Sequence, residues 1–376
     1  MQSNNSSYKL GEHPDLPAPA GTVGPIAWVR SNLFSSPTNI VLTILVFWFL
    51  YKLIPGSLNW FFLDAVFSGE DRNACIAAGD GACWAFVGQR FKLFTYGFYP
   101  EPERWRVNLS FIMLCFAIVP VLFDKTPFRK YGLYYAMAFP FIGGWLLIGG
   151  SFLGIFSLPV VATSEFGGIM LTLVIGVTGI AFSLPIGILL ALGRQSNLPI
   201  IRIFCIGFIE FMRGVPLITL LFVASTMLSY FLPPGTKFDL LLRVLIMVTL
   251  FASAYMAEVI RGGLQAIPKG QVEAADALGL KYWPTMRLIV LPQALKISIP
   301  GIVNTFIGLY KDSTLVIIIG LLDPLGIGQA SLADTKWTGL STEVYIFVAI
   351  FFFISCFSMS RYSLYLEGKL ETGHKR

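Results

Sequence analysis

The chain has 376 residues, of which 55% are hydrophobic and 13% are charged, and its formal net charge is +6. Ordinary soluble domains contain about 25% charged residues, so a soluble fold could not bury this much apolar surface. The only histidines, His13 and His374, lie near the chain ends, which excludes a histidine-based metal site and histidine catalysis. No basic cluster with interleaved aromatic residues occurs, so no nucleic-acid partner is expected.

The apolar residues form long blocks, several of them without charge for as many residues as a helix needs to cross a bilayer. Residues 1–37 are polar and are predicted to form an N-terminal tail, and residues 363–376 a C-terminal tail. The sequence therefore predicts an all-α polytopic membrane protein with about eight transmembrane helices. The expected spans are 38–54, 107–124, 132–156, 166–193, 203–231, 240–260, 297–322 and 342–361.

Lys and Arg residues indicate the orientation. With the N-terminus in the cytoplasm, sixteen of the 27 basic residues fall in inner segments and nine in outer segments. Five of those nine lie in the long first loop, where the positive-inside rule is weaker away from the span ends. Both termini are therefore expected to be cytoplasmic.

The first outer loop, at about 55–106, is rich in aromatic residues, which favour the membrane interface. Part of this loop is expected to lie along the outer surface, and a small compact cap is the alternative. Two of the five cysteines, Cys75 and Cys83, share this loop, and on an oxidising side of the membrane they are expected to form a disulfide. Cys115, Cys205 and Cys356 fall in apolar blocks and are expected to be free.

The inner loop at about 261–296 has a composition of its own. Pro268 and Gly270 mark a turn, and two short helices are expected over 272–280 and 282–291. We expect a break near Gly279 and a helix end at Pro292. This loop is predicted to be a structured cytoplasmic element.

Within that loop the sequence follows the pattern E-A-A, three residues, G, nine residues, I-x-L-P. The residues that match are Glu273, Ala274, Ala275, Gly279, Ile289, Leu291 and Pro292. The pattern resembles the signature of permease subunits of bacterial ATP-binding-cassette importers. The resemblance implies a coupling helix that docks on an ATPase subunit, and the competing interpretation is an amphipathic helix on the bilayer surface.

Other segments resemble the polar amino-acid permeases of the same superfamily. They are Glu210 with Phe211–Leu217, Ala254–Gln271, and Lys311–Leu315. The resemblance implies that residues 161–362 form a type I importer core of five helices. Residues 38–160, with three helices and the outer loop, look like the N-terminal extension of permeases in general L-amino-acid importers.

The resemblance also implies the partners and the location. The chain would be a multi-pass protein of the bacterial inner membrane and would work with a second, similar permease subunit. Two ATP-binding subunits would carry ATP and Mg, with no cofactor on this chain, and a periplasmic amino-acid-binding protein would deliver the substrate. The chain itself has no G-x-x-x-x-G-K-[ST] loop to hold ATP phosphates, so no enzymatic activity of its own is expected.

Two other classes of function remain open. An ion-coupled secondary transporter would not explain the coupling signature, and no repeated half suggests inverted symmetry. A membrane-embedded enzyme would need His, Cys or acidic residues clustered at one membrane depth, whereas few charges lie in the spans here.

Those few charges are the candidate substrate path. Glu210 and Arg213 are three apart, so they share a helix face and could neutralise each other. Lys311 and Asp312 are consecutive and point about 100° apart, so at least one is expected to pair with another helix. The alternative to bracing pairs is contact with the two charged ends of an amino acid. The candidate set is Glu210, Arg213, Gly214, Pro216, Glu258, Lys311, Asp312, Ser313 and Thr314.

Overall fold

The computed structural model describes residues 24–370 except 153, 155, 228, 229, 231, 232 and 234–237. Most of the expected N-terminal tail and the end of the C-terminal tail therefore lie outside the described residues. The chain divides into two compact units, one formed by Met1–Val66 with Asn73–Ala82 and the other by Phe67–Arg72 with Cys83–Arg376.

The first unit contains α1 (Pro25–Asn32), α2 (Pro37–Leu58), the π-helical turn η1 (Asn59–Leu63) and most of α3 (Arg72–Ala78). Helix α2 begins where Ser36 accepts a hydrogen bond from the Asn39 amide, with Pro37 in the first turn, which is a favoured start for a helix. Together α2 and η1 make a candidate span of 27 residues.

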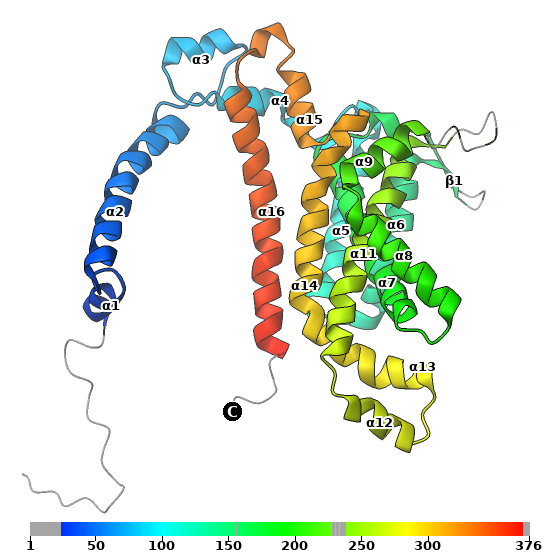
Figure 1. Cartoon of the computed structure of the whole chain (residues 1–376). Coiled ribbons are helices and arrows are strands. Elements are labelled where there is room, and N and C mark those ends of the chain that lie inside the picture. Colours follow the sequence, from blue (N-terminus) through cyan, green and yellow to red (C-terminus); the bar gives the residue numbers. More distant parts are fainter. Residues whose placement is uncertain are drawn as a thin grey trace, which may run out of the picture. The chain divides into compact units, whose positions relative to one another are not determined.

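The second unit contains the remaining helices and one small hairpin (Figure 1). Its longer elements are α4 (Trp84–Tyr96), α5 (Arg104–Leu122), α6 (Arg129–Ile148), β1 (Gly150–Phe152), β2 (Phe156–Leu158), α7 (Gly168–Arg194), α8 (Pro199–Gly214), α9 (Leu217–Phe222), α11 (Leu240–Gln265), α12 (Lys269–Ala277), α13 (Tyr282–Thr285), α14 (Leu291–Asp312), α15 (Pro324–Ser331) and α16 (Ser341–Leu370). The short turns are η2 (Glu101–Glu103), η3 (Thr163–Glu165), η4 (Val223–Met227), η5 (Met286–Val290), η6 (Ser313–Ile319) and η7 (Thr335–Trp337).

Among the described residues, seven helices are long and apolar enough to cross a membrane. An eighth span arises if the bent pair Pro199–Gly214 and Leu217–Met227 is counted as one. Each expected span overlaps one of these eight. The third ends at Ile148 and not at 156, because Gly149 and Gly150 adopt φ +85° and +94°, and the antiparallel β1–β2 hairpin follows.

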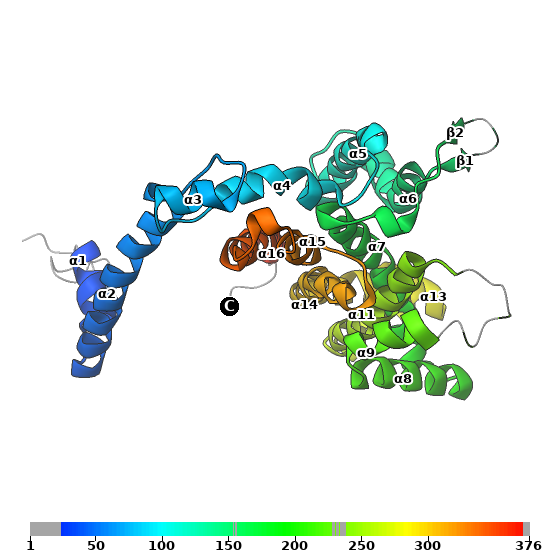
Figure 2. The same cartoon turned by 90° about the horizontal axis from the view of Figure 1, so that it is seen from above.

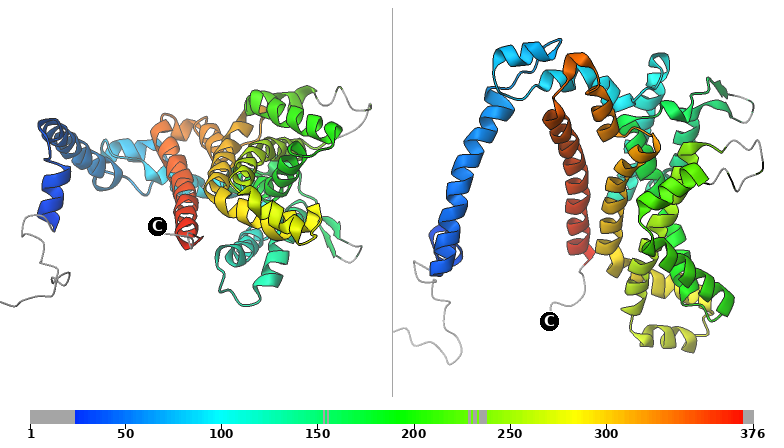
Figure 3. Two further views of the ribbon diagram at one scale, coloured as in Figure 1. Left: turned by 60° about the horizontal axis from the view of Figure 1, so that its bottom comes forward. Right: turned by 45° about the horizontal axis from the view of Figure 1, so that its top comes forward.

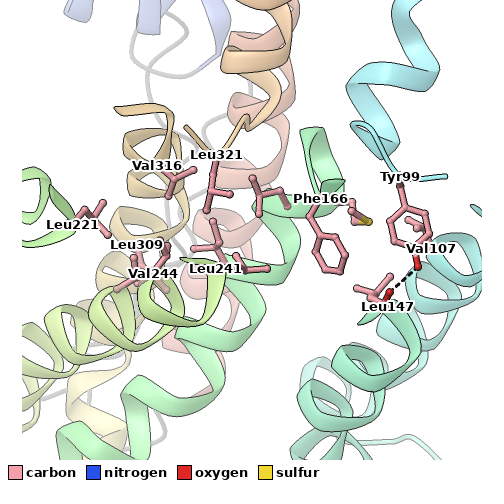
Figure 4. Packing of buried hydrophobic residues seen from close by; sticks show 14 of the residues in the cluster. Tyr99, Val107, Leu147, Phe166, Leu221, Leu241, Val244, Leu309, Val316 and Leu321 are labelled. Atoms are coloured by element: carbon pink, nitrogen blue, oxygen red, sulfur yellow. Dashed lines mark hydrogen bonds between the residues drawn. The ribbon is translucent and has the colours of Figure 1, made fainter. Parts of the chain in front are cut away.

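Helices α7, α11 and α14 form the centre of the second unit (Figure 2). Small residues allow this close packing: a Cβ at Gly187 would lie 2.7 Å from the Met256 side chain, and one at Gly179 would lie 2.7 Å from Leu309. Figure 4 shows the buried cluster around Leu241, Val244 and Leu309, continued through Phe166 to Tyr99. The Tyr99 hydroxyl donates to the Leu147 carbonyl at 2.7 Å.

The α5–α6 hairpin is held by a fully buried arginine. Arg106 donates to the carbonyl oxygens of Leu146 (2.6 Å), Pro159 (2.9 Å) and Leu147 (3.2 Å), and it pairs with Glu103 at 3.3 Å. A buried guanidinium needs several acceptors to offset its lost hydration, and these partners supply them. The end of α6 is thereby fixed to the start of α5.

We call the end of the second unit that carries α12 and α13 the coupling end, and the opposite end, with α4 and α15, the far end (Figure 3). At the far end α4 packs into the core. Phe94 is fully buried, with its ring 4.8 Å from that of Phe347 and 6.4 Å from that of Phe86. The aromatic residues of this helix were expected at the membrane interface; these two instead fill the protein interior, because α15 and α16 cover them.

The chain segments cross with almost no space between them at the far end. Gly97 and Gly168 have φ +62° and +60°, and a Cβ at Gly97 would lie 2.4 Å from the Gly167 Cα. The Gly168 amide donates to the Leu322 carbonyl at 2.8 Å. Only glycine fits such a backbone-to-backbone contact in the left-handed region. The N-terminal extension is thus joined directly to the start of α7.

At the coupling end the extension also touches the last helix. The Tyr362 hydroxyl donates to the Leu122 carbonyl at 2.7 Å, and Lys369 pairs with Asp124. Asp124 pairs with Arg129 as well, at 3.0 Å. The hydrogen bond from Lys369 is the main reason why the pKa of Asp124 is lowered. Helix α16 therefore contacts the extension near both of its ends.

Candidate functional site

The loop of the E-A-A pattern forms a helical hairpin at the coupling end. Helix α12 follows Pro268 and ends at Gly279, which has φ +74°. The Gly279 amide donates to the Asp276 carbonyl (2.9 Å) and the Leu280 amide to the Ala275 carbonyl (3.1 Å). This pair of bonds is the Schellman arrangement that ends helices at a left-handed glycine. The break expected near Gly279 is therefore present.

The second half of the loop differs from the expectation. Pro292 does not end a helix: α13, η5 and α14 run on as one helical stretch from Tyr282 to Ile319. Pro292 lies in the first turn of α14, directly after the π-helical turn η5. The wider π-helical turn leaves space for the proline ring. Because it does not require a hydrogen bond from the nitrogen of Pro292, the helix continues.

The pattern residues divide between two surfaces. Glu273 and Ala274 are exposed, as is Leu278 at the tip, whereas Ala275 is buried against its own chain. Of the two alanines only Ala274 faces outward, because α12 packs on η5. Ile289 and Leu291 are half-buried and Pro292 is exposed. The outward surface of α12 is thus small and contains a carboxylate.

A second site is a group of charges that we call the inner charge cluster, formed by Arg194, Glu210, Arg213, Glu258 and Arg261. Arg194 donates to Glu258 at 2.7 Å and to Glu210 at 2.9 Å. Arg261 donates to Glu258 through two nitrogens, at 2.8 and 3.0 Å. Arg213 lies 3.7 Å from Glu258. These ion pairs join α7, α8 and α11.

Glu210 and Arg213 do not pair with each other, although their spacing would allow it. Although they are three residues apart, Glu210 turns to Arg194 on α7, and Arg213 turns to Glu258 on α11. Arg213 also lies over the Tyr255 ring, 5.7 Å from its centroid. For each of the two residues, the charged partner on a neighbouring helix lies closer than the partner on α8.

The helix that carries Arg213 is broken immediately after it. Helix α8 ends at Gly214, and the following helical segment starts at Leu217 with a bend of 101°. Gly214 has no heavy atom within 4 Å of the place where a Cβ would be, and Pro216 is exposed. The break therefore exposes backbone beside a charged side chain.

Lys311 and Asp312 lie at the end of α14, where the winding changes to the 3-10 turn η6. Lys311 is exposed and Asp312 half-buried, and in the described part of the chain neither side chain has an ion pair. Ser313 and Thr314 donate to the carbonyls of Tyr310 and Lys311, at 2.7 and 3.0 Å. The hydroxyl groups of Ser313 and Thr314 therefore both donate to backbone carbonyls one turn earlier.

Sequence reasoning missed two members of the inner charge cluster, Arg194 and Arg261. The i, i+3 spacing of Glu258 and Arg261 on one helix could have indicated that pair. Arg194 carries no such signal, since its partners are 16 and 64 residues away in the chain.

The two cysteines that lie near α3 and α4 are bonded. Cys75 and Cys83 are both disulfide-bonded, whereas Cys115, Cys205 and Cys356 are free. At the far end, the Cys83 amide donates to the buried carboxylate of Glu343 at 3.2 Å.

Comparisons with known proteins find related sequences. Residues 183–372 match the model of the family described as "Binding-protein-dependent transport system inner membrane component". The chain is 51% identical to the inner membrane amino-acid ABC transporter permease protein YhdY of Escherichia coli K12, over 97% of this chain and 98% of that protein. It is 47% identical to the glutamate/glutamine/aspartate/asparagine transport system permease protein BztC of Rhodobacter capsulatus, over 96% of each.

Shorter relatives match about half of this chain. The probable glutamine ABC transporter permease protein GlnM of Bacillus subtilis is 35% identical over 54% of this chain and 91% of its own length. Among solved structures, an amino acid ABC transporter with histidines is 29% identical and covers 54% of this chain, with a TM-score of 0.48. By its family match and by relatives that align along nearly its whole length, this chain belongs to the inner membrane components of binding-protein-dependent transport systems.

Proposed function

We propose that this permease carries amino acids into the cell. As a member of its family it is a multi-pass inner membrane subunit of an ABC importer, a transport component and not an enzyme, which works with ATPase subunits and a binding protein. The observation that carries the choice of substrate is the identity of 51% and 47% to two amino-acid permeases along almost the full chain. An ammonium and a carboxylate at the ends of one small substrate also suit a path with charges of both signs.

The assembly that we infer contains this chain, a second and similar permease, two ATPase subunits that bind ATP and Mg, and a periplasmic amino-acid-binding protein. The exposed face of α12, with Glu273, Ala274 and Leu278, would dock on one ATPase subunit. A carboxylate there can pair with a basic group of that partner. Movement of the ATPase pair would then be transmitted through α12 to α11 and α14, and the core would alternate between inward and outward openings.

For the orientation we propose that both termini are cytoplasmic, which places the coupling end inside and the far end in the periplasm. This agrees with the excess of Lys and Arg in the segments assigned to the inside. A disulfide at Cys75 and Cys83 would then face an oxidising compartment. A reporter active only outside the cytoplasm should be active when inserted near Gly79 and silent after Arg376; the reverse pattern contradicts the orientation.

For the substrate path we propose the broken region after α8 and the end of α14. Arg213, Gly214 and Pro216 supply a charge and open backbone at a bend. Non-helical backbone within a membrane is tolerated where it lines a cavity. Lys311 adds an exposed ammonium, and Asn304, seven residues earlier, lies on the same exposed face of α14. Lipid would not accommodate that polar face, so water, substrate or the second permease should cover it.

The experiment that tests the function uses the complete transporter. Purification in mild detergent with mass spectrometry should recover ATPase subunits and a second permease together with this chain. Reconstituted in vesicles with the binding protein, the complex should take up labelled amino acids only when ATP is present on the coupling side. Uptake that persists without ATP and follows an ion gradient would establish a secondary transporter and overturn the proposal.

A further inference from the structure

Glu258 lies at the junction of three helices, and both of its carboxylate oxygens are occupied. Oε1 accepts from Arg194 at the end of α7 (2.7 Å), and Oε2 accepts from Arg261, one turn further along α11 (2.8 and 3.0 Å). The same Oε2 is 3.7 Å from Arg213 at the end of α8. The Glu258 side chain is 15% exposed, the least of the five in the inner charge cluster. One carboxylate is therefore shared by three guanidinium groups.

The three arginines lead to different parts of the molecule. Arg213 immediately precedes the 101° break between α8 and the segment that follows. Arg261 donates to Gln265 at 2.9 Å, and Gln265 is the last residue of α11 before α12 begins at Lys269. Glu258 is thus connected by one ion pair to the helix break and by another to the helix end that leads into the coupling loop.

The charges in the cluster do not balance, since three arginines face two glutamates. All five side chains are partly exposed, between 15% and 54%. Partly solvated ion pairs contribute little net stability, so an exchange of partners around one carboxylate changes the free energy only slightly. The 3.7 Å contact between Arg213 and Glu258 is the longest in the cluster. A small movement of the helices would therefore change this contact first.

We propose that Glu258 is a positioning residue that couples the coupling loop to the helix break at Gly214. Displacement of α12 moves the end of α11 and Arg261, and Glu258 then tightens or releases its contact with Arg213. The break beside the substrate path changes its bend in response. The inference rests on the proposed function, and it gives Glu258 a role other than direct contact with substrate. A substrate ammonium would have to displace Arg194 or Arg261 from their short contacts.

The test uses the complete reconstituted transporter with its binding protein. Glu258→Gln keeps the size of the side chain and removes its charge. We expect normal assembly, with the stimulation of ATP hydrolysis by substrate-loaded binding protein reduced about tenfold, within the usual range of coupling between sites. Glu258→Asp should restore part of the stimulation. Glu101→Gln is the matched control, because Glu101 also pairs with an arginine three residues away, Arg104 at 2.8 Å, but outside the cluster.

A double variant separates coupling from bracing. If Glu258 acts through Arg213, Glu258→Gln with Arg213→Gln should lose no more stimulation than Glu258→Gln alone, whereas independent effects multiply. The inference would be overturned if the loss of stimulation in the double variant were the product of the losses in the two single variants. It would also be overturned if ATP hydrolysis by the Glu258→Gln complex were stimulated to within about twofold of the unaltered complex. If Glu258→Gln does not assemble, Arg213→Gln replaces it and must show the same loss with assembly intact; unaltered stimulation would overturn the inference equally. Absence of amino-acid uptake by the unaltered complex contradicts the proposed substrate instead, since stimulation of ATP hydrolysis is measured separately.

Discussion

The far end and the coupling end of the second unit both contain buried apolar packing, but a network of ion pairs is added at the coupling end. At the far end, buried aromatic rings and crossing glycines join α4 to α7, α15 and α16, and Phe86 packs on Trp337 at 5.6 Å. At the coupling end, partly exposed ion pairs join α7, α8 and α11. Close apolar packing tolerates little displacement, whereas solvated ion pairs can exchange partners. The contrast indicates a rigid far end and a coupling end built to rearrange.

The largest expected effect is at the coupling end. Gly279→Val places a β-branched residue at φ +74°, which disrupts the end of α12, so uptake should fall by about two orders of magnitude in a complex that still reaches the membrane. Glu273→Lys should have a similar effect through loss of ATPase docking. Gly279→Asn is the control, since asparagine tolerates this conformation, and it should retain most uptake. Normal uptake by both Gly279→Val and Glu273→Lys would contradict the assignment of this loop.

A smaller effect on transport, but a large one on stability, is expected at the far end. Phe94→Ala removes a fully buried ring and should lower the stability by about 3–5 kcal/mol. Phe91→Ala changes the same helix at a side chain that is 53% exposed and should have little effect. Thermal unfolding of the purified protein measures both. If the far end is a static support, uptake per assembled Phe94→Ala complex should be unchanged; a selective loss of uptake would show that the far end also moves.

The smallest effect concerns a buried carboxyl group at the far end. Asp323 is fully buried at the start of α15, where Oδ1 accepts from the Gly326 amide at 2.9 Å, and Oδ2 has no hydrogen-bond partner among the described residues. Burial raises its pKa from 3.8 to about 6. The folded state therefore binds the proton more tightly than the unfolded state, and stability falls as the pH rises from about 4 to 6.

Asp323→Asn should remove this dependence while it keeps the helix cap. The variant should match the unaltered protein near pH 4 and be more stable at pH 7.5, by at most about 3 kcal/mol for a shift of this size. Melting temperatures of the two proteins at both pH values measure the difference. An equal difference at the two pH values would show that the carboxyl group does not titrate in this range.

The sequence predicted the parts of the fold that local chemistry determines. Apolar blocks gave the spans, and Gly279 gave the end of α12, since its left-handed conformation needs glycine. The path of the chain at Pro292 could not be predicted, because a π-helical turn before the proline removes its usual effect. Within the candidate site, Glu210 and Arg213 were identified but their partners were not.

That failure has a physical cause. Spacing on one helix is visible in a sequence, but Arg194 meets Glu258 only after α7 and α11 have packed through small residues such as Gly187. The same reason explains Phe94, whose burial depends on α16, more than 240 residues later in the chain. Contacts between distant segments require the tertiary fold, and both ends of the second unit are made of such contacts.

The crossing of Gly97 with Gly167 sets a condition for shortening this protein. A relative that aligns with 54% of this chain is itself covered over 91% of its length, so shorter related chains exist. Removal of α4 from this chain would uncover Gly328 and Phe347, which now contact Phe94. A chain without α4 would expose this apolar surface and would be expected to aggregate through it. Polar replacements on α15 and α16 would have to accompany the deletion, so the shorter transporter must be redesigned at its new surface.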